Sequence, residues 1–384
     1  MRILIVGAGV GGLATARGLI AAGHDVDVWE RAPQLRTGGA AMTIFSNGAA
    51  ALAQLGRPID HLGSSTTAYE FRRQDGRVLA RADLRHMVRR CGFPVLTVPR
   101  ADLVNYLAAD LPPEMVHYGR DLASVTVGHS GVEVTDAEGA RHRADVLIGA
   151  DGYRSTVRSQ IHGDTGARPT GWTSWQGVGE VHDQLAQGTV GIGMFGVAGA
   201  CGFMPAGAGK VQWWFHAPGF PEDPAPPSPV GMLRSRFADY CAPADTVLAA
   251  ITDQDVGRYP HVVHRVSSRW GSGPTTLLGD AAHAFPPNQA QGANQAFEDA
   301  WLLTRALSST SRSAELPASL RRYERIRARR VRPLSQIAAM ETIMNKRPPS
   351  GAHILPDWIA TRGLTTLVRL FSNEVHQKPY QTRG

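Results

Sequence analysis

The sequence contains few cysteines. Cys91, Cys201 and Cys241 are the only three in 384 residues, and none belongs to a CxxC or CxxH grouping. An odd and scattered set of this kind predicts neither a disulfide framework nor a metal site. We therefore expect a protein of a reducing compartment, the cytoplasm, without a bound metal.

Lysine is equally scarce. Lys210, Lys346 and Lys378 are the only lysines, so arginine supplies almost all of the positive charge behind the net charge of +7. The densest basic segment, residues 321–332, carries apolar residues among its arginines. This pattern favours an amphipathic helix with a solvated face over a stripe that binds nucleic acid.

Long apolar runs are also missing. No stretch approaches the ~18 consecutive apolar residues of a membrane span, so no membrane-spanning helix is expected. The apolar start of the chain belongs to a glycine motif rather than to a signal peptide. A chain of 384 residues can bury a large core, and its length suggests two or three domains.

A strand, a tight glycine turn and a helix are predicted at the amino terminus. The apolar run at residues 3–6 leads into GAGVGG at residues 7–12, and apolar residues then recur at helical spacing. We predict that Gly7 makes the turn, that Gly9 lets the backbone approach a pyrophosphate, and that Gly12 lets the helix pack closely on the strand.

A second strand follows and ends at Glu30. Its carboxylate is placed to accept a hydrogen bond from an adenosine ribose, roughly 20 residues after the turn. The strands, the helix and the acid together indicate a dinucleotide site, and a coincidental glycine turn is the alternative. The motif does not distinguish one dinucleotide from another.

The rest of the chain alternates between β-structure and helices. We predict a hairpin over residues 66–81, a three-stranded meander over 122–144, a buried parallel strand at 145–150 and a second sheet over 172–215. Further predicted elements are a helix at 48–55 capped by Asn47, helices at 100–109 and 293–307, a helix of about ten residues ending near Cys241, a strand at 262–269, and an amphipathic segment at 359–371. A second GxGxxG at 191–196 is interpreted as a chance match in a Gly-rich strand.

Three separated segments then resemble one family. They are the glycine motif ending in Glu30-Arg31, the run DVLIGADGYRS at 145–155 with Arg158, and the run LGDAAHAFPP at 278–287 with QGANQA at 291–296 and EDA at 298–300. Together they resemble the single-component FAD-dependent aromatic monooxygenases, which are built like para-hydroxybenzoate hydroxylase. The resemblance covers about residues 1–340.

The resemblance implies an α/β fold. A Rossmann-like FAD-binding domain would be interleaved with a mixed β-sheet substrate domain and followed by C-terminal helices. The expected boundaries are 1–65, 98–165 and 270–310 for the FAD-binding domain, 66–97 and 166–269 for the substrate domain, and 311–384 for the C-terminal helical segment.

The resemblance also implies which residues contact FAD. Asp280 would accept from the ribityl hydroxyls, the helix beginning near Gly292 would face the flavin ring, and Arg100 would contact the cofactor. The small residues at 36–44 suit close passage beside a flat ligand, with an ordinary Gly-rich loop as the alternative. The full set expected at the cofactor, from these segments and the resemblance together, is Gly7, Gly9, Val10, Gly11, Gly12, Glu30, Arg31, Arg36, Ala41, Arg100, Leu122, Asp151, Gly152, Gly279, Asp280, Gln291, Gly292, Ala293 and Asn294. A purely structural role stays open for Asp280 and Arg100, and Asp151 has the alternative of a strand-end cap. His283 is expected to brace its loop rather than to act as a base.

The substrate site is expected on one face of the second sheet. Strand alternation places Gln212, Trp214 and His216 on one face and Val211, Trp213 and Phe215 on the other. The resemblance favours the Gln212 face, and it implies substrate contacts from Phe203, Met204, Gln212, Trp214, Pro286 and Asn288. His216 has two interpretations, a base that deprotonates a phenol or a cap on the sheet edge.

The chain also departs from the family pattern. It has Ala290-Gln291-Gly292 where Gly-Gln-Gly is frequent. The small urate-hydroxylase-like subgroup is the nearest pattern, but the positions of its substrate arginine and tyrosine fall near Ala200 and Gln212. We therefore do not expect urate as the substrate.

The activity implied by the resemblance is aromatic hydroxylation. NADPH or NADH would reduce FAD, O2 would add to give a C4a-hydroperoxyflavin, and one oxygen would pass to an electron-rich ring. The expected partners are a small aromatic substrate and O2, with no nucleic acid and no membrane span, in a monomer or homodimer. Two alternatives stay open, another flavin oxidoreductase such as a dehydrogenase or epoxidase, and a non-catalytic FAD-binding protein.

Overall fold

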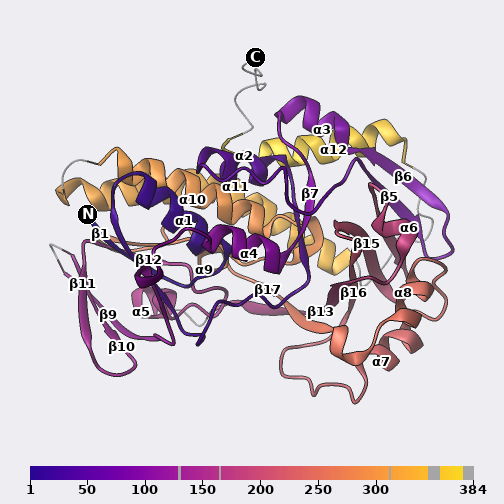
Figure 1. The fold of residues 1–384 in the computed structure, drawn as a ribbon, viewed down its shortest axis with the longest axis horizontal. Coiled ribbons are helices and arrows are strands. Elements are labelled where there is room, and N and C mark those ends of the chain that lie inside the picture. The colour runs from indigo at the N-terminus through magenta and orange to yellow at the C-terminus, as the bar shows by residue number, and fades with distance from the viewer. Residues whose placement is uncertain (129–130, 164–165, 311–312, 345–354, 375–384) are drawn as a thin grey trace.

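The protein is built around two large β-sheets joined by helices (Figure 1). A computed structural model describes residues 1–128, 131–163, 166–310, 313–344 and 355–374. The predicted α/β class is confirmed, with one parallel sheet, one mixed sheet and helices at the C-terminal end.

Five parallel strands form one end of the molecule. Their order is β18-β12-β1-β2-β8, and every neighbouring pair is parallel. The strands are β1 (Arg2–Val6), β2 (Asp25–Glu30), β8 (Val116–Tyr118), β12 (Val146–Gly149) and β18 (Thr275–Leu277). β12 and β18 are apolar or uncharged throughout and fully buried, as expected for the centre of a covered parallel sheet.

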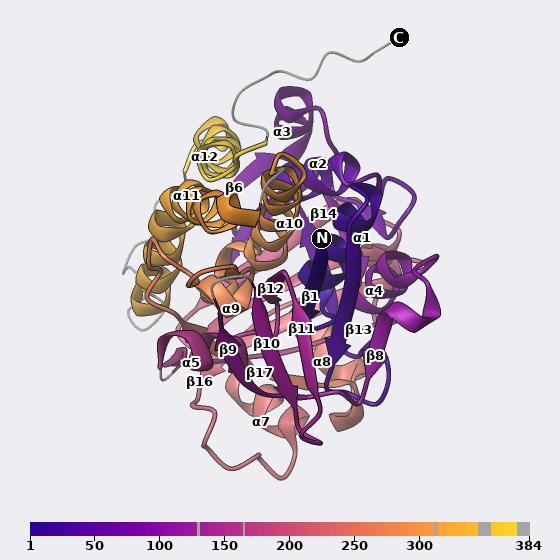
Figure 2. The same ribbon diagram turned by 90° about the vertical axis from the view of Figure 1, so that its left-hand side faces the viewer.

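Helices and a meander cover this sheet (Figure 2). The helices that pack side by side on it are α1 (Val10–Ala21), α4 (Arg100–Ala108) and α10 (Gly292–Ser308). The meander comprises β9 (Leu122–Val127), β10 (Val132–Asp136) and β11 (Arg141–Ala144), followed after β12 by α5 (Thr156–His162). It packs against the sheet at Trp29, whose ring meets His142 edge-on at 5.0 Å.

The second sheet has seven strands in the order β17-β13-β16-β15-β14-β5-β6. Its strands are β5 (Ala68–Arg73), β6 (Val78–Asp83), β13 (Arg168–Gly179), β14 (Val190–Gly196), β15 (Gly199–Gly207), β16 (Lys210–Pro218) and β17 (Gly257–Val263). Only the β14–β5 pair is parallel. One face carries a core of Trp213, Phe215 and Phe237 with the helices α6 (Asp183–Ala186), α7 (Pro229–Arg236) and α8 (Ala244–Ala250) nearby.

Smaller elements connect the two sheets. A three-stranded sheet consists of β3 (Ala41–Ile44), β7 (Leu96–Pro99) and β4 (Ser64–Ser65). The remaining short helices are α2 (Ser46–Gln54), α3 (Leu84–Cys91), α9 (Asp280–His283), η1 (Pro113–Met115), η2 (Asp253–Asp255), η3 (Pro287–Gln289) and η4 (Ser313–Glu315).

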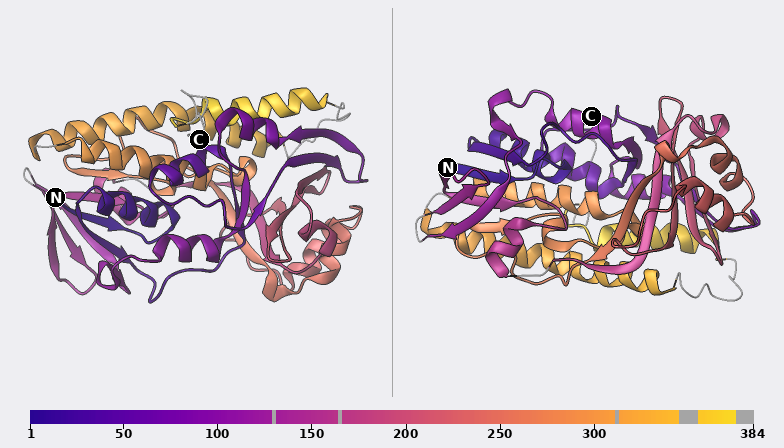
Figure 3. Two further views of the ribbon diagram at one scale, coloured as in Figure 1. Left: turned by 45° about the horizontal axis from the view of Figure 1, so that its top comes forward. Right: turned by 90° about the horizontal axis from the view of Figure 1, so that it is seen from below.

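Two long helices complete the fold. In Figure 3, α11 (Leu316–Met344) runs along the molecule beside α10, and α12 (Asp357–Leu370) continues toward the edge of the second sheet. α12 packs on the edge strand β6 and on α3. None of the helices in the described part of the chain has the length and apolar content that a bilayer crossing requires.

Most of the predicted local elements are confirmed. The hairpin, the meander, the buried strand before residue 150 and the strand at the second GxGxxG are all present. The domain boundaries given above stay a prediction. The strands of the two large sheets fall within the ranges assigned to the two domains, whereas β7 of the small sheet crosses the boundary after residue 97.

Three local predictions are wrong. Asn47 lies inside α2, and its side chain donates to Gln291 and Glu298 rather than capping the helix. The strand predicted at 262–269 ends at Val263, because the backbone N–H of His264 donates to the carbonyl of Ala284 outside the sheet. The helix predicted to end near Cys241 ends at Arg236.

Candidate active site

The glycine turn has the geometry that its sequence predicts. Gly7 has a φ of 109°, and a Cβ there would overlap the backbone of Ala150 in the neighbouring strand end. A Cβ on Gly12 would overlap the carbonyl of Gly7, so α1 packs tightly on the turn. At Gly9 an added Cβ meets no protein atom within 4 Å. This space beside the turn suits the close approach of a phosphate.

The N-termini of α1 and α10 carry no side-chain cap from the described residues. α1 begins after Gly9 and α10 after Gln291. An added Cβ at Gly292 would also meet no protein atom within 4 Å. The free N–H groups and the positive helix end can therefore stabilise negative charge on a ligand at each position.

Glu30 is held in place by the backbone around it. Its two carboxylate oxygens accept hydrogen bonds from the N–H groups of Ala8, at 3.0 Å, and Ala32, at 2.9 Å. Arg36 forms an ion pair with it at 3.6 Å. Each carboxylate oxygen retains a second lone pair, so Glu30 can still accept from a ribose hydroxyl.

A cleft of about 2410 Å³ lies beside this region. It exceeds the roughly 300–1,000 Å³ of a pocket for one small ligand, so it can hold a dinucleotide together with a second molecule. Of the residues predicted to bind the cofactor, Arg36, Ala41, Arg100, Asp280, Gly292 and Ala293 line it. Of the residues predicted to bind substrate, Met204, Gln212, Trp214 and Asn288 line it.

Asp280 contributes a carboxylate to the lining of the cleft. It follows β18 and Gly279, and its side chain is open to the cleft. The surrounding protein still raises the pKa of this carboxyl above its usual value, because dense packing around it disfavours the charged form. Hydroxyl donors of a ligand would therefore stabilise the carboxylate, as the predicted flavin contact requires.

A buried ion-pair network fixes the backbone that carries Asp280. Asp299 of α10 accepts from the N–H of Gly279 at 2.8 Å, from the His283 ring at 2.6 Å and from Arg327 at 2.6 Å. Burial alone would raise the pKa of Asp299, but the charges of His283 and Arg327 hold it below its usual value. His283 thus braces the loop, as the resemblance implied.

Arg327 is the functional residue that the sequence analysis missed. It is fully buried, and its guanidinium also donates to Glu298 at 3.0 Å, Asn373 at 2.7 Å and the Gln295 side chain at 2.7 Å. Its position in line with the apolar residues of α11 could have revealed it. The prediction of a solvated arginine face is therefore wrong at this one arginine.

Arg100 closes the loop that leads into β3. Its guanidinium donates to the carbonyls of Arg36, at 2.6 Å, and Gly38, at 2.7 Å. Burial lowers the pKa of Arg100, which nevertheless stays charged. The side chain lines the cleft, so it both orders the loop and faces the position expected for the cofactor.

Trp214, His216 and Gln212 form one wall of the cleft. The Trp214 and His216 rings stack at 4.3 Å, and His261 meets His216 edge-on at 4.6 Å. Gln212 donates to the carbonyl of Ala41 at 2.7 Å and thereby joins the second sheet to β3. The predicted alternation is confirmed, because Trp213 and Phe215 lie in the core on the other face.

Two predicted substrate contacts are placed elsewhere. Phe203 is fully buried in the core with Trp213 and Phe215, so the expectation that it faces the substrate is corrected. Its partner across the ladder is Trp213, and paired residues share a face of the sheet. Pro286 is buried beside the cleft lining, which its neighbours Phe285 and Pro287 form.

Several residues that were predicted to bind the cofactor form hydrogen bonds within the protein and do not line the cleft. Asn294 is buried and accepts from the N–H of Phe45 at 2.9 Å. Gln291 is buried beside Asn47, whose side chain donates to it at 3.1 Å. Asp151 accepts from the Ser155 hydroxyl at 2.5 Å and from the N–H of Val157 at 3.1 Å, so its side chain binds the start of α5, and a cofactor contact from Asp151 stays a prediction.

The other predicted cofactor residues lie around the glycine turn. Gly11 lies beside Leu278, which follows β18, and Ala296 of α10. Gly279 adopts a φ of 55° before Asp280, and Leu122 is a core residue at the start of β9. Val10, Arg31 and Gly152 are partly or fully exposed. Cofactor contacts from these residues stay predictions.

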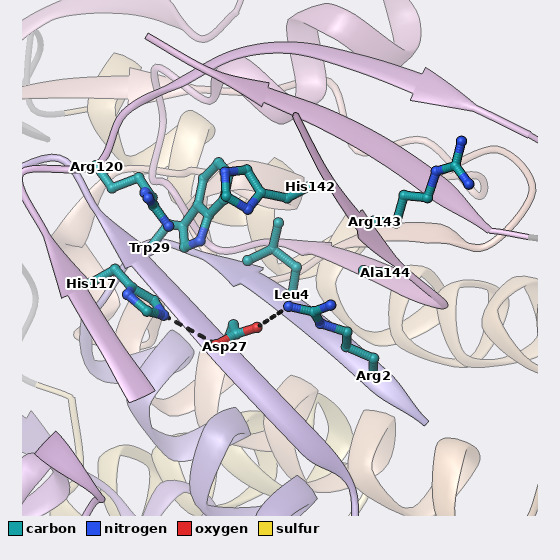
Figure 4. Close-up of a pocket in the computed structure, with 9 residues that line it drawn as sticks. All are labelled: Arg2, Leu4, Asp27, Trp29, His117, Arg120, His142, Arg143 and Ala144. Carbon is teal, nitrogen blue, oxygen red and sulfur yellow. Dashed lines mark hydrogen bonds and ion pairs between the residues drawn. The ribbon is translucent and has the colours of Figure 1, made fainter. Parts of the chain in front are cut away.

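A second hollow of about 100 Å³ lies between the parallel sheet and the meander (Figure 4). Asp27 pairs with Arg2 at 3.4 Å and with His117 at 3.1 Å. The Trp29 ring is covered by the guanidinium of Arg120 at 5.1 Å. These ion pairs join β1, β2 and β8 within the parallel sheet, so the polar groups of this hollow pair with one another.

The comparisons with known proteins agree with this geometry. Residues 1–338 match the family described as FAD binding domain. Aurachin C monooxygenase/isomerase from Stigmatella aurantiaca is 32% identical over 333 residues, which cover 86% of each protein. FAD-dependent urate hydroxylase from Klebsiella pneumoniae is 30% identical over 350 residues, which cover 87% of this chain and 88% of that protein.

A solved structure shows the same fold. Klebsiella pneumoniae HpxO in complex with FAD and uric acid superposes with a TM-score of 0.89 and 27% identity, covering 97% of each chain. Together with the cleft, the glycine turn and Asp280, these matches identify FAD as the cofactor and NAD(P)H as its electron donor. The chain therefore belongs to the FAD-binding-domain family, among the FAD-dependent aromatic monooxygenases.

Proposed function

We propose that this protein hydroxylates a small aromatic or heteroaromatic molecule. The observation that supports this most directly is that one continuous cleft joins Asp280 and the N-terminus of α10 to the Trp214 wall. The cofactor and an aromatic substrate can therefore bind next to each other in this one cleft. Bound FAD supplies the oxygen chemistry, with NADPH or NADH as electron donor and O2 as oxidant.

In this proposal the chain's own residues bind, orient and exclude water. Asp280 holds the cofactor's sugar-like chain, and the N–H groups at Gly292 and Ala293 stabilise negative charge at the ring edge. The Trp214 ring offers a flat apolar surface for the substrate. An apolar wall of this kind keeps bulk water from the reacting centre.

His216 is proposed to accept the proton of a phenolic substrate. Its ring lines the cleft and forms no hydrogen bond to any residue in the described ranges. Burial, and then the neighbouring His261, lower its pKa well below the usual value, so the imidazole is neutral near pH 7 and has an acceptor nitrogen. The alternative is a purely structural role at the sheet edge.

The His216→Ala variant tests this role. We expect a lower kcat and loss of the acidic limb of the pH–rate profile, because no imidazole is left to titrate. His61→Ala, which removes an exposed imidazole that does not line the cleft, serves as the control. An unchanged pH–rate profile in His216→Ala would remove His216 from the reaction.

The proposed setting is the cytoplasm, where the chain acts as a monomer or homodimer with no nucleic-acid partner. All three cysteines are free, which supports a reducing compartment. Urate is not the proposed substrate, since Ala200 and Gln212 line the cleft where the urate-hydroxylase pattern leads us to expect arginine and tyrosine.

A substrate panel tests the proposed function. The FAD-loaded protein is mixed with NADH or NADPH and a series of phenols, aminobenzoates and N-heterocycles, and cofactor oxidation and product mass are followed. We expect one or more compounds to accelerate NAD(P)H oxidation and to gain one oxygen atom. Oxidation of a substrate without gained oxygen would contradict hydroxylation and favour a dehydrogenase.

A further inference from the structure

The cleft extends beyond the Trp214 wall to the C-terminal helix. One face of α12 lines this extension with Ile359, Ala360, Gly363, Leu364 and Leu367. Residues at these spacings lie along a single face of a helix. No charged side chain belongs to this row, so the helix presents an apolar surface to the cleft.

The opposite side of the extension is also apolar. Tyr69 and Phe71 of β5 and Leu79 and Ala80 of β6 line it. The Tyr69 and Phe71 rings meet edge-on at 5.0 Å. We call the space between these four residues and the five of α12 the α12 chamber.

α12 is fixed on the edge strand that forms the chamber. The side chains of Asp357 and Thr361 accept from the N–H groups of Arg81, at 2.8 Å, and Asp83, at 2.9 Å. Farther along, the carbonyl of Leu370 accepts from Arg330 of α11 at 2.8 Å. The exposed edge of the sheet is thereby covered, and the chamber has a defined wall.

Gly363 keeps the chamber open. Glycine is unfavourable inside a helix, so its presence usually reflects a need for close packing. Here an added Cβ would meet no protein atom within 4 Å, so packing does not require glycine. Gly363 is exposed and lines the cleft, so the space at this position is open to the cleft, and the small Ala360 beside it adds to that space. A site left open at a cost to helix stability indicates a ligand group that occupies it.

We propose that the α12 chamber binds a straight hydrocarbon chain carried by the aromatic substrate. This rests on the proposed function, since the ring must reach the Trp214 wall while the chain extends toward Gly363. The nine residues that define the chamber include no charged side chain, so this space suits a hydrocarbon chain better than a charged substituent. The charged end of the β5–β6 hairpin, where Arg73 pairs with Asp75, also lines the cleft and would exclude the chain from that side.

Binding of 4-n-alkylphenols to the FAD-loaded protein tests the chamber. Titrations from 4-methylphenol to 4-octylphenol are expected to show affinity rising about 4-fold for each added methylene until the chamber is filled, as transfer of a methylene from water implies. Equal affinity for the methyl and octyl compounds would overturn the proposal.

Gly363→Phe separates the chamber from unspecific hydrophobic binding. The ring would fill the gap, so the octyl-to-methyl affinity ratio should fall toward one. Gly363→Leu, a smaller change, should give an intermediate ratio if the phenylalanine variant does not fold. Arg362→Phe adds the same ring on an exposed position of α12 and should retain the wild-type ratio. A wild-type ratio in Gly363→Phe or Gly363→Leu would contradict the proposal.

The same compounds distinguish failure of the chamber from failure of the proposed function. If phenols gain oxygen but their affinity does not depend on chain length, the chamber is wrong and hydroxylation stands. If none gains oxygen but the chain-length trend and its loss in Gly363→Phe are observed, the chamber stands and the proposed function is wrong.

Discussion

Asp280 is placed where a single carboxylate decides how tightly the cofactor is held. Asp280→Asn removes the charge but keeps the size of the side chain. We expect the dissociation constant for FAD to rise about 10- to 100-fold, as for loss of hydrogen bonds to a charged acceptor. Fluorescence titration of FAD onto the apoprotein measures this. Asp245→Asn, on the exposed surface of α8, is the control, and equal affinities in both variants would exclude the role.

The histidine pair beneath Trp214 makes stability depend on pH. Burial, with His261 as the second cause, lowers the pKa of His216 well below its usual value, and burial lowers the pKa of His261 to about 4. Below pH ~6.5 the unfolded chain therefore binds more protons than the native state. The free energy of unfolding should therefore decrease as the pH is lowered below ~6.5, by at most ~1.4 kcal/mol per pH unit for each imidazole.

Denaturant unfolding at pH values from 7 to about 4 measures this slope. His261→Gln removes one imidazole of the His216–His261 pair and should reduce the slope, whereas His61→Gln, at an exposed position, should leave it unchanged. Unfolding free energies that are the same at pH 7 and pH 5 in the wild type would contradict the assignment of neutral, buried histidines.

The roles of single residues were predictable where they depend only on the neighbouring sequence. The roles of Gly7 and Gly12 follow from the turn itself, and the alternation of Gln212 and Trp214 follows from one strand. Phe203 was misplaced because its direction depends on its pairing with Trp213, which is set by the register between two strands. Register is not visible in the pattern of one strand alone.

At the scale of elements, α10 and α11 are joined through a buried guanidinium. Arg327→Met leaves the carboxylates of Glu298 and Asp299 buried without their partner. Because breaking a buried ion pair from one side costs about 3–5 kcal/mol, we expect a loss of unfolding free energy in that range and weaker FAD binding. Arg325→Met, at an exposed position of the same helix, should cost little. Equal losses in both variants would contradict the network.

The existence of helices was predicted more reliably than the contacts that their side chains make with distant parts of the chain. The arginine-rich helix and the final amphipathic helix both exist, since apolar spacing reports an amphipathic face directly. The burial of Arg327 and Asn47 depends on carboxylate and amide groups from α10 that lie far away in the sequence. Composition alone gave no reason to place an arginine in the core, where unpaired charges are excluded.

At the scale of the whole molecule, the chain passes repeatedly between two sheets and leaves a cleft where they meet (Figure 1). The glycine turn, the strand before Asp151 and the strand before Asp280 come from distant parts of the chain, and the parallel sheet brings β1, β12 and β18 side by side. The resemblance to a family predicted this return of the chain. The extension of the cleft to α12 was not predictable, because it depends on how a C-terminal helix docks on an edge strand.

The central claim is that this cleft transfers an oxygen atom from O2 to a ring. Turnover of an active phenol under isotopically labelled O2, in unlabelled water, tests it most directly by mass spectrometry of the product. The account predicts that each product molecule carries one labelled oxygen atom. A product without the label, or NAD(P)H consumption that yields only hydrogen peroxide with every substrate tried, would contradict it.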